Sequence, residues 1–156
     1  MARDKDKKRR PWDGKERRDS SKVLVVNDDT GGCELIVRVL SGAGFEAQGV
    51  NSQQSALEKL GEMLPRCVVL DLAAGGIGSS LKLLDNIRSH HDERVSSTRA
   101  ILVANSSKNR DFSFQSGADA FVTRPFHAND LVTSVHDVLD RPDEERARHR
   151  RDQLNQ

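Results

Sequence analysis

Several features that usually direct the interpretation of a sequence are scarce in this chain of 156 residues. No apolar stretch approaches the roughly 20 residues of a membrane-spanning helix, and the basic N-terminus is not followed by an apolar region. Secretion and membrane insertion are therefore not expected, and we expect a cytoplasmic protein. The net charge is only +1, so the overall charge favours neither nucleic acid nor an anionic membrane as a partner.

Cysteines and nucleotide-binding motifs are also scarce. Cys33 and Cys67 both fall at positions expected on apolar faces, which indicates buried thiols rather than a disulfide or a metal site. Gly31 and Gly32 follow the first apolar run, but the lysine of a phosphate-binding loop and the three-glycine dinucleotide fingerprint are missing. We therefore expect no nucleotide cofactor.

The sequence divides into a central region with charged segments on either side. Residues 1–21 form a basic arm with almost no aliphatic side chains, so we expect disorder there. Within it, Arg17, Arg18 and Ser20 match the short pattern of basophilic serine-kinase substrates. Residues 141–156 place acids before bases, an order that suits a helix dipole, but show no apolar stripe. This tail is interpreted as a solvated helix, with a docking segment as the alternative.

The central region, residues 22–140, alternates apolar runs with helical patterns. Continuous short apolar runs bounded by turns indicate buried parallel strands. With right-handed crossovers, five strands and five intervening helices form a three-layer α/β sandwich. The expected strands are residues 23–26, 45–50, 67–70, 100–104 and 120–123.

Three of these runs end on polar residues suited to phosphate chemistry. The first is followed by Asn27 and Asp28, the third by Asp71, and the fifth by Arg124. Ligands of an open parallel sheet bind outside the carboxyl ends of its strands. Two carboxylates and one guanidinium therefore converge on one edge, which suits a divalent cation and a phosphoryl group.

With these residues placed, residues 22–140 resemble a receiver domain of the two-component response-regulator family. The resemblance rests on the order of four landmarks, which are Val-Leu-Val-Val-Asn-Asp-Asp at 23–29, Val-Val-Leu-Asp-Leu at 68–72, Gly-Ala-Asp-Ala-Phe at 117–121 and Arg-Pro-Phe at 124–126. It implies a flavodoxin-like sheet of strand order 2-1-3-4-5. It also implies that Asp71 accepts a phosphoryl group from a histidine kinase, a phosphotransfer protein or a small phosphodonor.

The resemblance assigns a role to each residue around Asp71. Asp28 would be the main ligand of Mg²⁺, Asp71 the second, and the backbone carbonyl of Ala73 the third. Arg124 stands where the family carries a lysine that pairs with the acyl phosphate. Asn105 stands at the position of the hydroxyl that moves toward the phosphoryl group.

The same resemblance assigns a docking face. Phe121 matches the switch aromatic, and Phe126 would lie on the face through which single-domain members bind a downstream protein. We expect no output domain after Asp140 and no enzymatic activity beyond self-phosphorylation and self-dephosphorylation. A homodimer is compatible with the family, whereas nucleic-acid binding through the arm is disfavoured by its interleaved acids.

The site also departs from the family. Asn27 replaces the first acid of the usual pair, so it would touch the metal weakly or through water, and Mg²⁺ binding should be weak. Arginine replaces lysine at Arg124, and an amide replaces the hydroxyl at Asn105. Two functions follow. The first is an atypical single-domain response regulator that docks in a phosphate-dependent way, and the second is a degenerate receiver that binds proteins without phosphate.

Overall fold

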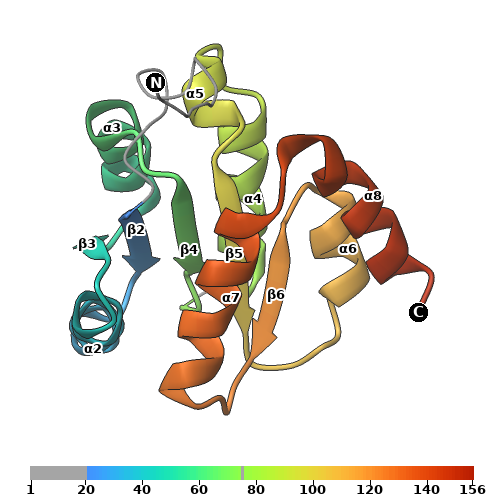
Figure 1. Ribbon diagram of the computed structural model, residues 1–156. Helices are drawn as coiled ribbons and strands as arrows, with labels where there is room; N and C mark the ends of the chain where they lie inside the picture. Colours follow the sequence, from blue (N-terminus) through green and yellow to red (C-terminus); the bar gives the residue numbers. More distant parts are fainter. Residues whose placement is uncertain (1–20, 75) are drawn as a thin grey trace, which may run out of the picture.

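The computed structural model describes residues 21–74 and 76–156, and its centre is a five-stranded parallel sheet (Figure 1). The strand order β3-β2-β4-β5-β6 is the order 2-1-3-4-5 expected for this region. The strands are β2 (Lys22–Asn27), β3 (Glu46–Val50), β4 (Cys67–Asp71), β5 (Arg99–Ala104) and β6 (Ala120–Thr123). The basic arm and Ser20 lie outside the described residues.

Seven helices occur in the described part of the chain, so the expectation of five helices was wrong. They are α2 (Thr30–Gly42), α3 (Gln53–Met63), α4 (Gly78–Arg88), α5 (Glu93–Ser96), α6 (Arg110–Gln115), α7 (Ala128–Asp140) and α8 (Asp143–Leu154). α5 was not expected, and α8 is the helix of the charged tail, which the count of five did not include. The single turn of α5 begins where the Asp92 carboxylate accepts a hydrogen bond from the Arg94 amide. A helix this short has no apolar periodicity from which it could be predicted.

Helices cover both faces of the sheet, which confirms the three-layer architecture. On one face, α2 and α7 pack on the strand residues of one buried cluster, whose members include Val25, Val69 and Val135. On the other face, α3 and α4 pack on a second cluster that includes Leu24 and Leu70. Successive strand residues alternate between the two clusters, because side chains of a strand point to opposite faces. The uninterrupted apolar runs are therefore explained by burial on both sides.

The tail after α7 does not behave as a solvated helix. α8 lies against α6 at the edge of the sheet beyond β6 (Figure 1), and Arg146 in its second turn is buried. The interpretation of a fully solvated tail was wrong because an apolar stripe is not the only way to dock a helix. Polar side chains hold α8, as described below.

Local features fit this fold. Cys33 and Cys67 are free, buried thiols, as expected. The Ser52 hydroxyl accepts a hydrogen bond from the Ser55 amide and so caps α3. Among residues 21–74 and 76–156, no helix is both long enough and apolar enough to cross a bilayer.

Candidate functional site

Asp71 is at the centre of the carboxyl edge of the sheet. It is the last residue of β4, it is only 1% exposed, and it pairs in register with Asn27 at the end of β2. The Asn27 side-chain amide donates a hydrogen bond of 3.1 Å to Asp71 Oδ2. The parallel register therefore brings two strand ends that lie 44 residues apart in the sequence into direct contact.

Arg124 reaches the same carboxylate from the loop after β6. Its Nη2 donates to Asp71 Oδ2, and its Nη1 lies 3.5 Å from Oδ1 of Asn105. The Arg124 side chain is 36% exposed, so one side of the guanidinium faces solvent. A planar fork suits this bridging position, because its several N–H groups can serve two acceptors at once.

Asp28 binds the loop that follows β4. Its two oxygens accept hydrogen bonds from the amides of Ala73 (3.3 Å) and Ala74 (2.8 Å). The neighbouring Asp29 has a different role, since its carboxylate accepts from the Gly32 amide at 2.7 Å and caps α2. Of these two consecutive aspartates, Asp28 therefore faces the site and Asp29 serves the helix.

Oxygen donors suited to a hard divalent cation are present at this edge. Asp71 Oδ1 is buried and has no hydrogen-bond partner among the described residues. An orphaned carboxylate oxygen is costly unless a cation or a reacting group satisfies it. Further oxygens at this edge come from Asp28, which follows β2, and from the Ala73 carbonyl after β4, which accepts from the Gly76 amide at 3.0 Å.

These donors fit one Mg²⁺ with few protein charges. Residues 21–74 and 76–156 contain no group of three or more histidine, cysteine, aspartate or glutamate side chains arranged to hold a metal. The Asn27 side-chain oxygen already accepts from the Asp29 amide at 2.8 Å. The expected ligand set therefore offers two carboxylates, and the remaining positions of an octahedral ion fall to carbonyl oxygen and water.

The two aromatic residues assigned to docking lie on opposite faces of the sheet. Phe121 is partly buried and packs against the core cluster beneath α3 and α4. Phe126 packs against the other cluster, beneath α2 and α7. The structure thus brings together Asn27, Asp28, Asp71, Asn105 and Arg124, but it does not join Phe121 and Phe126 into one surface.

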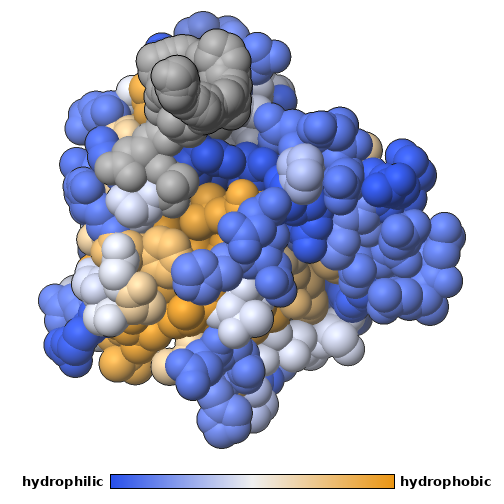
Figure 2. Space-filling view, in the orientation of Figure 1, coloured by the Kyte–Doolittle hydropathy of each residue, from blue (hydrophilic) through white to orange (hydrophobic). Residues whose placement is uncertain are grey.

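An apolar cavity beside the site was not expected from the sequence. It has a volume of about 630 Å³ and lies between α2 and α7, with Asn27 and Arg124 among its polar lining residues. Figure 2 shows apolar surface in the same region. One feature of the sequence could have indicated this cavity. The apolar positions of α2 extend beyond its buried face to Leu35, which is 56% exposed.

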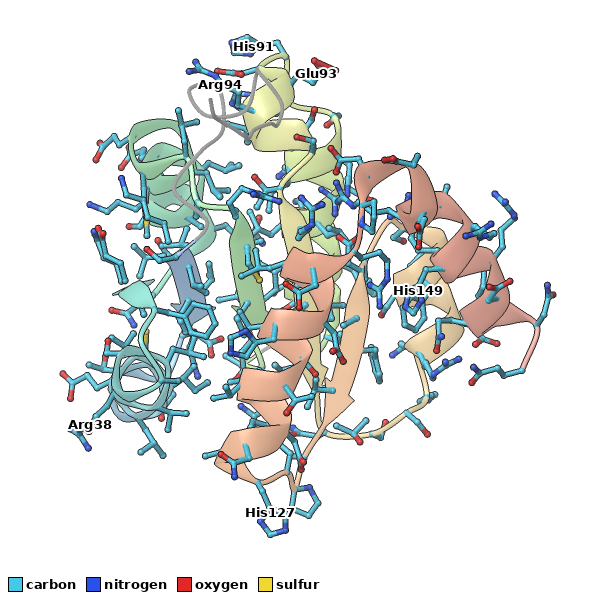
Figure 3. All side chains as sticks on the ribbon, in the orientation of Figure 1. Arg38, His91, Glu93, Arg94, His127 and His149 are labelled. Carbon is cyan, nitrogen blue, oxygen red and sulfur yellow. The ribbon has the colours of Figure 1, made fainter. Side chains whose placement is uncertain are left out.

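Among the described residues, the histidines do not form a metal-binding group at the carboxyl edge. His90 and His91 stack with ring centroids 4.5 Å apart, and His90 Nδ1 accepts from the Asp92 amide. Figure 3 places His91 at the end of the molecule opposite His127, which lies in the loop before α7. The His90–His91 pair therefore belongs to the α4–α5 connection.

Comparisons with known proteins identify the family of this chain. The family model of the response regulator receiver domain matches residues 23–136. The DNA-binding response regulator MtrA of Mycobacterium tuberculosis is 30% identical over 126 residues, which cover 81% of this chain and 54% of MtrA. The phosphate regulon transcriptional regulatory protein PhoB of Escherichia coli is 26% identical over 120 residues, which cover 77% and 52%. The chain thus spans about half the length of these curated relatives.

Solved structures show the same fold. A response regulator from Chloroflexus aurantiacus superposes with a TM-score of 0.68 at 27% identity, covering 77% of this chain and 98% of that one. A receiver domain from Bermanella marisrubri gives 0.70 at 23% identity, covering 78% and 100%. The family model matches well over half of the chain, and the sheet order agrees with it. The chain belongs to the response regulator receiver domain family.

Proposed function

We propose that this protein is an atypical response regulator that accepts a phosphoryl group on Asp71 and signals by phosphate-dependent protein docking. The observation that carries the proposal is the Asp71 carboxylate itself. One of its oxygens is bound by Arg124 and Asn27, while the buried Oδ1 has no partner among the described residues. The first oxygen is therefore held in place while the second stays available to react.

The chemistry requires little of the protein beyond positioning and charge. Asp71 Oδ1 forms a bond to phosphorus while the P–N bond of a phosphohistidine breaks, and the leaving imidazole keeps the electron pair and takes up a proton. A carboxylate is a weak nucleophile, so catalysis comes from orientation and from neutralising the phosphoryl charge. Arg124 holds the carboxylate in orientation and offers further N–H groups to the incoming oxygens. The side-chain amide of Asn105, next to Arg124, is a second donor for these oxygens.

Asp28, Asp71 and the Ala73 carbonyl are the residues that would hold Mg²⁺, with Asn27 contributing through water. The bound ion supplies neutralisation of the phosphoryl oxygens. Asp28 already accepts two backbone hydrogen bonds, so it would use its remaining lone pairs for the metal. Binding is accordingly expected to be weak.

A phosphate-independent interaction module is the second candidate. It is favoured by the ion pair of Arg124 with Asp71, which neutralises the carboxylate before any phosphoryl group arrives. An amide at Asn105, in place of a small hydroxyl, also alters the switch position. In that case the protein would bind its target with Asp71 unmodified.

The two candidates separate in one experiment. The purified full chain is incubated with Mg²⁺ and acetyl phosphate and its intact mass is measured. We expect a gain of one phosphoryl group that is absent in Asp71→Asn and strongly reduced in Asp28→Ala. Asp29→Ser is the matched control, because it removes a neighbouring carboxylate but keeps a residue able to cap α2.

Absence of any gain in a folded wild-type chain, with a typical receiver reacting in parallel, would reject phosphorylation and support the second candidate. If phosphorylation is found, the donor in the cell would be a histidine kinase or a phosphotransfer protein, and the readout a downstream protein or a homodimer. A cytoplasmic location suits both donors. MtrA and PhoB are named for DNA binding or transcriptional regulation, but with a net charge of +1 we do not propose nucleic-acid binding for this chain.

A further inference from the structure

α8 is attached to the domain although it has no apolar stripe. Eleven of its twelve residues, Asp143–Leu154, are charged, polar or alanine, and apolar burial can therefore contribute little to its docking. Nevertheless the Arg146 side chain is only 10% exposed. The attachment must rest on hydrogen bonds and ion pairs.

Asp119 is the anchor of this attachment. It precedes β6, and its side chain is only 2% exposed. Arg146 donates from Nε (2.9 Å) and Nη2 (3.0 Å) to its two oxygens. Arg150, one helical turn later, lies 3.4 Å from Oδ1, and Arg88 of α4 donates to Oδ2 at 3.1 Å. One buried carboxylate thus holds two arginines of the same face of α8.

The rest of α8 runs antiparallel along α6. Arg110, the first residue of α6, donates to the carbonyl (3.0 Å) and side-chain oxygen (2.6 Å) of Gln153 near the end of α8. Phe114, further along α6, makes an edge contact with His149, at a centroid distance of 6.5 Å. Figure 3 shows His149 between the two helices. Phe114 is buried, whereas Phe112, on another side of α6, is 54% exposed.

The connection to α7 is short and extended. Arg141 and Pro142 both have extended backbone dihedrals, so two residues separate the helices. A helix that is joined through a short extended link, and held by few apolar contacts, opens more easily than the core.

We propose that α6 and the Asp119 carboxylate form a recognition site for a helix with arginines one turn apart, and that α8 fills this site in cis. Asp119 supplies the charge for the two guanidiniums, and Phe114 supplies an apolar ring beside them. A partner that docks on this part of α6 has to displace α8 first. That consequence rests on the proposed docking function, whereas the recognition site itself does not.

The test uses the full chain and a peptide of its own residues 142–156, acetylated and fluorescently labelled. Arg146→Ala weakens the cis helix, so we expect this variant to bind the wild-type peptide about tenfold more tightly than the wild-type chain does, as measured by anisotropy. Arg148→Ala is the matched control, because Arg148 is largely exposed and its ion pair among the described residues is a distant one, with Glu145 at 3.9 Å. It should behave as wild type, and a peptide carrying Arg146→Ala should bind none of the chains.

Hydrogen exchange provides the second measurement. We expect the amides of α8 to exchange about tenfold faster in Arg146→Ala than in wild type or Arg148→Ala, with β4 unchanged. Arg150→Ala removes the more exposed of the two α8 arginines that Asp119 holds, and it should accelerate exchange in α8 by a smaller factor. This second variant keeps the proposal testable if Arg146→Ala does not fold.

Unchanged exchange in α8, or equal peptide binding by all three chains, would overturn the proposal. Neither measurement requires phosphate. A chain that fails to react with acetyl phosphate can therefore still show the recognition site, and a reactive chain can lack it.

Discussion

The two edges of the sheet each pair a buried aspartate with arginine, but the two pairs differ in how completely the carboxylate is satisfied. At the carboxyl edge, Asp71 receives one guanidinium and one amide on the same oxygen, and its other oxygen has no partner among the described residues. At the amino edge, hydrogen bonds from three arginines and from the Ala100 amide occupy both oxygens of Asp119.

The difference shows how the same residue types serve two purposes. An unsatisfied oxygen beside a partly solvated guanidinium leaves room for a ligand or a reaction. A saturated carboxylate surrounded by buried guanidiniums leaves none, and it fixes the elements that carry those arginines. Asp119 links α4, α8 and the start of β5, whereas Asp71 links only strand ends that the sheet already holds in place.

Neutralising each aspartate in turn should give the largest difference between the two edges, measured as the free energy of unfolding. Asp119→Asn removes the buried counter-charge of Arg88 and leaves Arg146 with the exposed carboxylate of Asp143 at 3.4 Å. We expect the free energy of unfolding to fall by about 3–5 kcal/mol. Asp71→Asn should change it by no more than about 1 kcal/mol, because Arg124 is partly exposed and water can replace the lost partner. Urea unfolding of both variants and wild type measures the two differences.

Similar losses at the two positions would contradict this account. An intact far-ultraviolet spectrum for both variants is the required control. A smaller m-value for Asp119→Asn would indicate that α8 has already detached from the native state.

Lowering the pH should weaken the ion pairs of Asp119 at the amino edge. Burial raises the pKa of Asp119, but the hydrogen bond and charge of Arg146, with the charge of Arg88, outweigh burial and hold that pKa below its ordinary value. Because the folded pKa is lower than the unfolded value of about 3.9, the ion pairs stabilise the fold above that pH. Their contribution is lost as pH falls through the folded pKa.

We therefore expect wild type to lose stability more steeply than Asp119→Asn below about pH 4. Arg88, Arg146 and Arg150, which face the carboxylate, stay charged over this range. Asp92, whose pKa its contacts with Arg94 lower to about 2, also titrates there, but both chains contain it and its effect cancels. Parallel curves for the two chains would contradict the assignment.

Adding a carboxylate at the carboxyl edge should strengthen the binding of Mg²⁺ there. Asn27→Asp restores a third acid beside Asp28 and Asp71, and we expect Mg²⁺ to bind about tenfold more tightly. Isothermal titration with MgCl₂ measures the affinity. Asn129→Asp, an exposed change on α7, adds the same charge away from the site and should have little effect.

An unchanged affinity in Asn27→Asp would mean that Asn27 does not face the metal. The loss of its hydrogen bond to Asp71 provides an independent check, because the variant should be less stable than wild type without Mg²⁺.

The carboxyl edge could be predicted from the sequence, whereas the amino edge could not. Parallel strands bring their ends together whatever the intervening segments, so Asn27 and Asp71 had to be neighbours once β2 and β4 were identified. α8 lacks the apolar period on which helix docking is usually judged. Its contact depends on Arg146 meeting Asp119, which lies 27 residues earlier, and no local pattern encodes that distance.

The positions of Phe121 and Phe126 were harder to predict for a related reason. Phe121 lies within β6, where alternate side chains face opposite sides, and Phe126 lies beyond the strand. Their spacing alone does not say which face each one joins once a loop intervenes. The structure resolves this by packing them on different clusters.

Removing the arginine at the carboxyl edge should have the smallest effect on stability. Arg124→Gln leaves Asp71 with its hydrogen bond from Asn27, and the lost ion pair is partly solvated. We therefore expect the free energy of unfolding to change by less than about 1 kcal/mol. The same variant should lose most of its labelling by acetyl phosphate, because the cation nearest to the reacting carboxylate is gone. Arg124→Gln would then lose its reactivity while keeping its stability. A loss of several kcal/mol instead would mean that the Asp71–Arg124 pair holds the fold together as Asp119 does.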